Sequence, residues 1–77
     1  MQEYPIRIMN LKDLAQFHKY VLSNNLRGQI RQKNYVANVR STLSLAIALP
    51  LDAASLCLEE GTQVKEDVIR NICRISA

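Results

Sequence analysis

A serine beside an arginine is the feature of this sequence that most directly suggests chemistry. The segment Asn38-Val39-Arg40-Ser41 precedes an apolar run over residues 42–49. Ser41 therefore lies at a predicted helix start, where unpaired backbone N–H groups and the helix dipole favour an anion. As an N-cap, the Ser41 side chain would accept from one of these N–H groups and contribute about 1 kcal/mol. As a phosphorylation site, it would carry a phosphate that faces the helix dipole and the Arg40 cation.

The other reactive side chains do not form a catalytic or metal-binding pattern. His18 falls within a predicted helix and has no neighbouring nucleophile or paired carboxylate. Cys57 and Cys73 are too far apart in sequence to belong to one metal cluster, and they indicate reduced thiols. We therefore expect a protein that is not an enzyme and that holds no metal and no cofactor.

Positive charge is concentrated in the first half of the chain. The net charge is +3, and seven cations face only Asp13: Arg7, Lys12, Lys19, Arg27, Arg31, Lys33 and Arg40. Such an excess suits an acidic, phosphorylated or nucleic-acid partner. The cations are spread singly, without the aromatic and glycine pattern of an RNA-binding strand. Nucleic-acid binding through Arg27, Arg31, Lys33 and Arg40 is thus the alternative function and the less favoured one.

Length and composition predict a single packed domain over residues 1–77. The chain has 77 residues, and 48% of them are apolar. The longest apolar stretch, residues 43–51, contains Ser44 and Pro50 and is far shorter than the roughly 20 residues that a membrane span needs. The amino-terminal residues do not resemble a secretory signal. We expect a cytoplasmic protein without a membrane span, and the sequence leaves its oligomeric state open.

The first half of the sequence predicts a strand, a helix and a hairpin. Residues 4–9 alternate between apolar and polar side chains, and Pro5 restricts them to an edge strand or a strand start. Apolar residues at helical spacing predict a helix over residues 11–25, with Asn10 or Asp13 near its start. Residues 29–32 and 35–39 read as two strands, joined by a tight turn in which Asn34 takes the left-handed conformation.

The second half predicts a short helix, a strand and a terminal helix. Residues 41–49 alternate as in a strand, but their alanines and leucines and the Ser41 cap favour a helix. Residues 53–59 form the fourth predicted strand, and apolar residues three or four apart from Val64 to Ile75 predict the last helix. The order βαββαβα predicts an α+β fold, with a four-stranded antiparallel sheet and three helices on one face.

This element order and the run over residues 38–45 resemble the HPr family, the small phosphocarrier proteins of the bacterial sugar phosphotransferase system. The resemblance covers residues 4–75 and implies an open-faced β-sandwich. In that family an asparagine, an apolar residue, a basic residue and a serine precede the short second helix. Ser41 is therefore similar to the family's regulatory serine, which an ATP-dependent kinase phosphorylates, and Arg40 takes the place of the basic residue.

The family's phosphoryl-accepting histidine is missing. Family members carry it in a Gly-x-His-Ala-Arg-Pro motif at the start of the first helix, where this chain has residues 10–15, Asn-Leu-Lys-Asp-Leu-Ala. His18 lies at least one turn further along and does not replace it, because the chemistry needs an imidazole at the helix start, where N–H groups cradle the phosphate. A phosphocarrier that uses His18 is a remote third possibility.

The resemblance therefore implies an HPr-like protein without phosphocarrier activity. We expect it to act as a regulatory, protein-binding module that contacts a phosphotransferase-system component, a serine kinase or a transcription regulator. The predicted partner surface is formed by the first two helices, and its apolar candidates are Leu43, Leu45, Ile47 and Leu49, with Leu51 next to them. The alternative is purely structural: these side chains fill the core of a small domain.

Overall fold

The computed structural model describes residues 2–76 and contains the predicted elements in the predicted order. The chain forms the following strands and helices: β1 (Gln2–Ile8), α1 (Leu11–Ser23), β2 (Gly28–Gln32), β3 (Tyr35–Asn38), α2 (Thr42–Ala48), β4 (Leu51–Leu58) and α3 (Glu66–Cys73). The α+β class and the βαββαβα order are confirmed.

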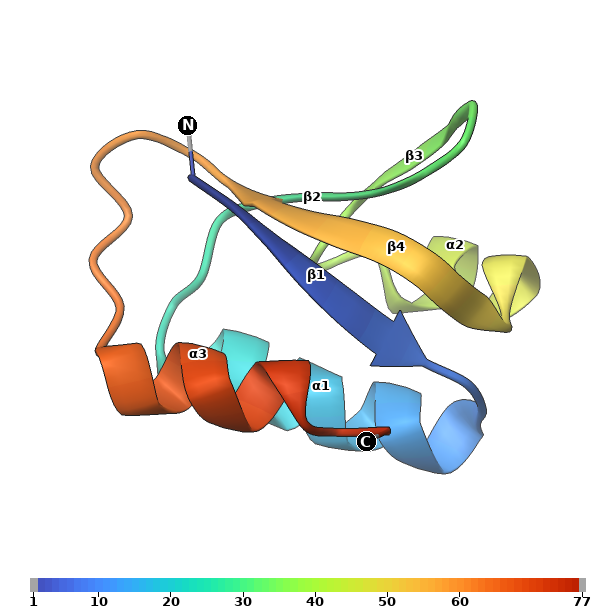
Figure 1. Ribbon diagram of the computed structural model, residues 1–77, viewed down its shortest axis with the longest axis horizontal. Coiled ribbons are helices and arrows are strands. Elements are labelled where there is room, and N and C mark those ends of the chain that lie inside the picture. The colour runs from blue at the N-terminus through green and yellow to red at the C-terminus, as the bar shows by residue number, and fades with distance from the viewer. Residues whose placement is uncertain (1, 77) are drawn as a thin grey trace.

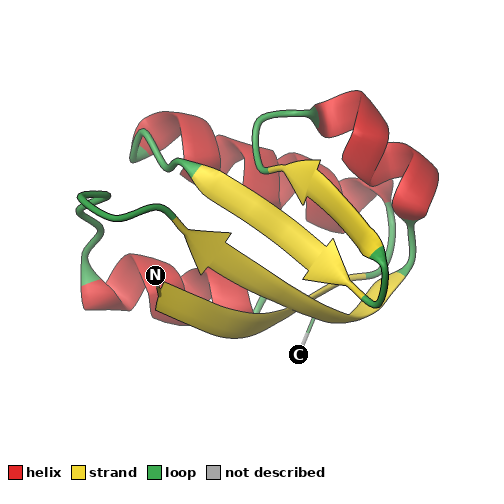
Figure 2. Ribbon diagram, turned by 90° about the horizontal axis from the view of Figure 1, so that it is seen from above, coloured by secondary structure: helices red, strands yellow, loops and turns green. Residues whose placement is uncertain are grey.

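The strands form one antiparallel sheet in the order β1-β4-β2-β3. Its central strands are β4 and β2, and β1 lies at an edge, as Pro5 requires. Helices α1 and α3 lie across one face of the sheet, and α2 lies beside α1 next to the β2–β3 hairpin (Figures 1 and 2). The opposite face of the sheet is free of helices among residues 2–76. This layout is the open-faced sandwich of the HPr type.

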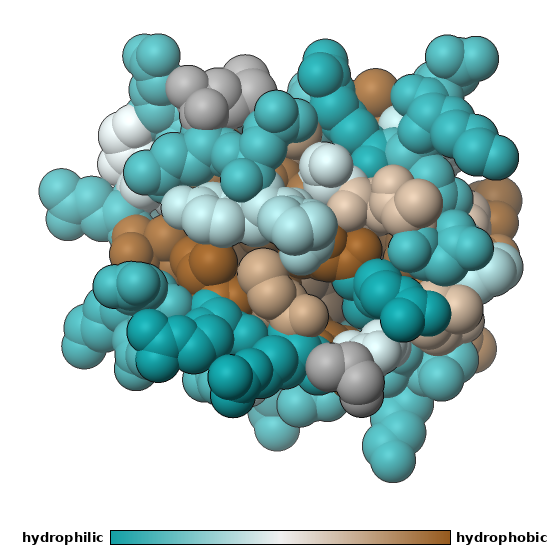
Figure 3. All heavy atoms as spheres, in the orientation of Figure 1, coloured by the Kyte–Doolittle hydropathy of each residue, from teal (hydrophilic) through white to brown (hydrophobic). Residues whose placement is uncertain are grey.

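One hydrophobic core joins the sheet to the helices. Alternate residues of each strand point toward the helices; Ile6, Ile30 and Leu56 are buried there. Buried residues three or four apart on α1 and α3 meet them: Leu14, Phe17, Val21, Ile69 and Ile72. The space-filling view shows apolar atoms in a band between β1 and α3, where the core reaches the surface (Figure 3).

Several element ends differ from the sequence prediction. Strand β4 begins at Leu51, two residues before the predicted start, because the pairing with β1 extends to Ile8 opposite Leu51. Helix α3 begins only at Glu66, so that Val64 packs against the core from the preceding loop. In the hairpin turn the left-handed residue is Lys33, with φ 54°, and the prediction of Asn34 was wrong.

No helix within residues 2–76 combines the length and the apolar character that crossing a membrane requires.

Candidate functional site

Ser41 lies at the start of α2, as predicted, but its side chain does not cap the helix. Its backbone occupies the N-cap position, and no backbone N–H of the first turn donates to its hydroxyl. The Ser41 hydroxyl is half-buried and donates to the Ser44 hydroxyl at 3.0 Å. The predicted cap hydrogen bond was therefore wrong: the hydroxyl donates to Ser44, one turn further along, and accepts from no backbone N–H of the first turn.

Arg40 extends away from Ser41, toward the loop that follows α1. Its Nε donates to the Leu26 carbonyl at 3.3 Å, and its Nη2 donates to the Asn25 side-chain oxygen at 2.5 Å. The Arg40 backbone N–H donates to the Asn38 side chain at 2.9 Å. The guanidinium is thus held by neutral oxygens of another loop. A phosphate on Ser41 would have to draw it out of these hydrogen bonds.

The four residues predicted as a partner surface divide into two pairs. Leu43 and Ile47 are both 77% exposed, as expected of a contact surface. Leu45 is 1% exposed and belongs to the core, and Leu49 is half-buried against it. The prediction of Leu45 as a surface residue was wrong: in a helix, residues two apart point in different directions. Leu51, the first residue of β4, is also buried.

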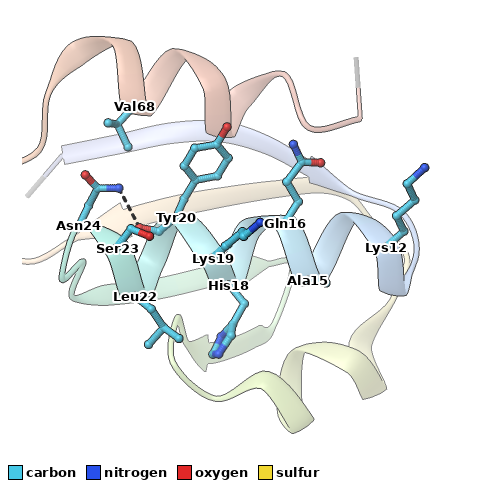
Figure 4. Close-up of a pocket in the computed structure, with 10 residues that line it drawn as sticks. All are labelled: Lys12, Ala15, Gln16, His18, Lys19, Tyr20, Leu22, Ser23, Asn24 and Val68. Carbon is cyan, nitrogen blue, oxygen red and sulfur yellow. Dashed lines mark hydrogen bonds between the residues drawn. The ribbon is translucent and has the colours of Figure 1, made fainter.

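His18 connects α1 to the first turn of α2. Its Nδ1 lies 3.1 Å from the hydroxyl of Thr42, and the side chain is half-buried. His18 and Leu22 point from α1 toward α2, whereas Tyr20 points toward α3 (Figure 4). The hydroxyl of Thr42 is the one hydrogen-bond partner of the imidazole found within residues 2–76. This setting differs from a histidine at a helix start that is surrounded by backbone N–H groups.

The start of α1 is already occupied by the chain's own polar groups. The Asn10 side chain accepts from the Asp13 backbone N–H at 2.9 Å, and the Asp13 carboxylate accepts from the Met9 N–H at 3.1 Å. The Ser76 hydroxyl also donates to Asp13. The Ser76 hydrogen bond, followed by that from Met9, lowers the pKa of Asp13. A carboxylate therefore stands at the helix end where an incoming phosphate would need to bind.

A second set of exposed apolar residues lies on α1, the helix that contacts α2. Leu11 is 67% exposed and Leu22 is 55% exposed. Leu22 lies on the side of α1 that carries His18 (Figure 4), and the helical repeat places Leu11 on the same side. The sequence contained the signal for them, because residues 11, 18 and 22 are spaced by seven and four, the repeat of one helix face. We call Leu11, His18, Leu22, Leu43 and Ile47 the α1–α2 surface.

Cations stand beside this surface. Lys12 and Lys19 are exposed and line the same depression along α1 as His18 and Leu22 (Figure 4). The one acidic residue of α1 and α2, Asp13, is engaged with Ser76. The α1–α2 surface is therefore apolar with a positive rim.

The basic residues named for nucleic-acid binding are divided between different parts of the molecule. Arg31 pairs with Ser55 on the sheet face that carries no helix within residues 2–76. Lys33 lies in the hairpin turn, and Arg27 and Arg40 line a cleft at the other end of β2. The structure therefore separates these cations instead of joining them into one basic stripe.

Both cysteines are free thiols. Cys57 is 2% exposed and donates to the Glu3 carboxylate at 3.3 Å. Burial and the hydrogen bond with Glu3 raise the pKa of Cys57, and burial raises the pKa of Cys73.

Within residues 2–76 no three histidine, cysteine or carboxylate side chains stand close enough together to hold a metal ion.

No protein-family model matches the chain, and no curated protein and no solved structure is significantly similar to it.

Proposed function

We propose that this chain is an HPr-like protein that does not carry phosphoryl groups and that binds another protein through the α1–α2 surface. The observation that carries the proposal is the exposure of Leu11, Leu22, Leu43 and Ile47 on two adjacent helices. A contiguous exposed apolar patch on a small protein marks an interaction site. The resemblance to the HPr family supports a regulatory role connected with the sugar phosphotransferase system.

The start of α1 supports the absence of phosphocarrier activity. A phosphocarrier needs a histidine whose phosphate is received by free N–H groups at a helix start. Here Asn10 and Asp13 take up that position, and the Asp13 carboxylate would repel a phosphate. His18 faces Thr42 instead.

The rim of the surface indicates the chemistry of the partner. Lys12 and Lys19 lie next to the exposed leucines, and Asp13 is turned toward Ser76. Charges of one sign around an apolar patch select a partner of the opposite sign and increase its association rate. We therefore propose a partner that presents apolar side chains surrounded by carboxylates: a phosphotransferase-system component, a serine kinase or a transcription regulator.

Regulation through Ser41 is part of the proposal. A phosphate there would place at least about one and a half negative charges beside the α1–α2 surface and would repel an acidic partner. Incubation with an HPr-type serine kinase and ATP, followed by mass spectrometry, is the direct test. We expect the label in the wild type and none in Ser41→Ala; a label that persists in Ser41→Ala places the site elsewhere.

A phosphotransfer assay tests the first part of the proposal. We expect no acid-labile phosphate on the protein after incubation with phosphoenolpyruvate and the general phosphotransfer enzyme. Stable labelling on His18 would contradict it.

Binding assays with matched variants test the second part. Leu43→Ser and Ile47→Ser each remove an exposed apolar side chain and should leave the fold intact. We expect each to weaken binding to the partner by about tenfold or more, the loss of one well-packed contact. Val36→Ser is the control, because Val36 is 48% exposed on β3 and lies opposite Arg31, on the sheet face that carries no helix within residues 2–76. The proposal would be contradicted if all three variants weakened binding equally. It would also be contradicted if the protein bound none of the three partner classes.

A further inference from the structure

A polar cleft at the end of the molecule opposite the start of α1 has no place in the proposed function. It is formed where the α1–β2 loop meets the β3–α2 turn and the end of β4. The cleft has a volume of about 330 Å³ and is lined by Asn25, Arg27, Gly28, Asn38, Arg40 and Glu59. It adjoins a second polar hollow of about 450 Å³ that is lined by residues 24–25, 27 and 59–63.

The walls of the cleft are fixed by hydrogen bonds between segments far apart in sequence. The Arg27 carbonyl accepts from the Glu59 backbone N–H at 3.0 Å, and the Gly28 carbonyl accepts from the Val39 N–H at 3.1 Å. Arg40 is held on its backbone side by Asn38 and on its side chain by Asn25 and Leu26. The cleft is therefore preorganised, which reduces the entropy that binding a ligand costs.

Two arginines line the cleft, and neither forms an ion pair within residues 2–76. The acceptors of Arg40, the Leu26 carbonyl and the Asn25 amide oxygen, are neutral, and they use two of its five N–H donors. The one ion pair within residues 2–76 joins Arg70 to Glu66, far from the cleft. Glu59 contributes one carboxylate to the lining without coming within ion-pair distance of Arg27 or Arg40. Two arginines, of which Arg40 is held in place, against the one carboxylate of the lining leave a positive site.

We infer that this cleft binds a phosphate group. Guanidinium groups keep their charge at every physiological pH, and their planar fork of donors fits the oxygens of a phosphate. A dianion engages two arginines better than a single carboxylate does, and the amides of Asn25 and Asn38 add neutral donors. The inference is independent of the partner proposed for the α1–α2 surface.

The phosphate group has two possible sources, inorganic phosphate or a small phosphate monoester. The adjoining hollow would receive the uncharged remainder of a monoester, because its lining is polar: Asn24, Thr62 and Gln63, with the carboxylates of Glu59 and Glu60. NMR titrations with inorganic phosphate and with glycerol 3-phosphate, at constant ionic strength, separate the two sources. Tighter binding of glycerol 3-phosphate indicates a monoester, and tighter binding of inorganic phosphate indicates the free ion.

In both titrations we expect saturable chemical-shift changes at the backbone N–H groups of residues 25–28, 38–40 and 59–62. Arg27→Gln should weaken binding about tenfold, the loss of one charge-assisted interaction. Glu59→Gln should strengthen binding, because it removes the carboxylate that competes with phosphate. The side chains of Arg27 and Glu59 are both exposed, so we expect both variants to fold.

The matched control is Arg7→Gln, which removes the same charge from an exposed position near the far end of β1. We expect it to leave the affinity unchanged. Shifts that do not saturate, an equal effect of Arg7→Gln and Arg27→Gln, or weaker binding by Glu59→Gln would each overturn the inference.

Discussion

At the scale of single residues, the Asp13 side chain prevents phosphate from binding at the start of α1. Its carboxylate accepts hydrogen bonds from Met9 and from Ser76, which lies 63 positions away in sequence. These bonds stabilise the ionised form and so lower the pKa of Asp13. Through the hydrogen bond from Ser76, the same carboxylate connects the segment after α3 to the start of α1. Asp13 is therefore both an element of stability and an obstacle to phosphate at this helix end.

The lowered pKa makes stability depend on pH in a defined direction. The contribution of Asp13 is fully present above its unfolded-state pKa of 3.8 and is lost as the pH falls further through the lower folded-state pKa. We expect Asp13→Asn to be less stable than the wild type at pH 7 and to lose less stability on acidification below about pH 4. Urea unfolding at pH 7 and at pH 3 measures both effects.

The exposed carboxylate Asp52 on β4 provides the matched control as Asp52→Asn. If Asp13→Asn and the wild type lost stability in parallel on acidification, the hydrogen bonds of Asp13 would not govern this region of pH. Ser76→Ala should raise the pKa of Asp13, since the Ser76 hydroxyl is the largest cause of its shift.

At the scale of secondary-structure elements, the packing of β2 against β4 depends on a residue without a side chain. A Cβ atom on Gly28 would lie 2.1 Å from the Cys57 carbonyl oxygen, a backbone atom that cannot move alone. Gly28→Ala should therefore separate the two central strands at the edge of the polar cleft that Arg27 and Arg40 line. We expect a loss of about 3 kcal/mol in the free energy of unfolding, at the upper end of overpacking costs.

Gly61→Ala is the comparison for this variant. Gly61 has a φ of +84° but no atom within 4 Å of the added Cβ, so that only backbone strain of about 1 kcal/mol is expected. Equal losses in the two variants, measured by urea unfolding, would show that the contact with Cys57 is not decisive.

Helix α2 presents opposite environments to residues two positions apart. Leu45 is 1% exposed and Leu43 is 77% exposed. We expect Leu45→Ala to reduce the free energy of unfolding by about 3 kcal/mol, through lost burial and the remaining cavity. Leu43→Ala should change it by less than about 0.5 kcal/mol. Denaturant unfolding of both variants checks the orientation of α2, and a reversed order would mean that the helix is rotated about its axis.

At the scale of the whole molecule, one core holds every element together. Buried residues from all four strands and all three helices belong to a single hydrophobic cluster. Residues 2–76 contain no second core on which a part of the chain could fold alone. Both proposed binding sites are built on this one core. The α1–α2 surface lies on the helices, and the polar cleft lies at the loops beyond the end of α1.

We therefore expect unfolding in one cooperative step. Far-ultraviolet circular dichroism, which reports the helices, and tyrosine fluorescence, which reports side-chain packing, should give the same urea midpoint. Separate midpoints would indicate that α3, joined to β4 by a long loop, melts before the sheet.

The element order was predictable from the sequence because it depends on local patterns. Alternation marks the strands, a repeat of three or four marks α1 and α3, and Asn10 marks the start of α1. For α2 the alternation was misleading, and the helical propensity of its alanines and leucines identified it correctly.

Only the tertiary structure decided which side chains meet. His18 and Thr42 are 24 positions apart, and Arg40 and Asn25 are 15 apart, so that no local pattern joins them. The burial of Leu45 and the exposure of Leu43 depend on how α2 is rotated against α1 and the sheet. The sequence thus determined the elements, because backbone propensity and periodicity act over a few residues. The tertiary fold determined the candidate sites, because hydrogen bonds and burial join segments that the chain keeps apart.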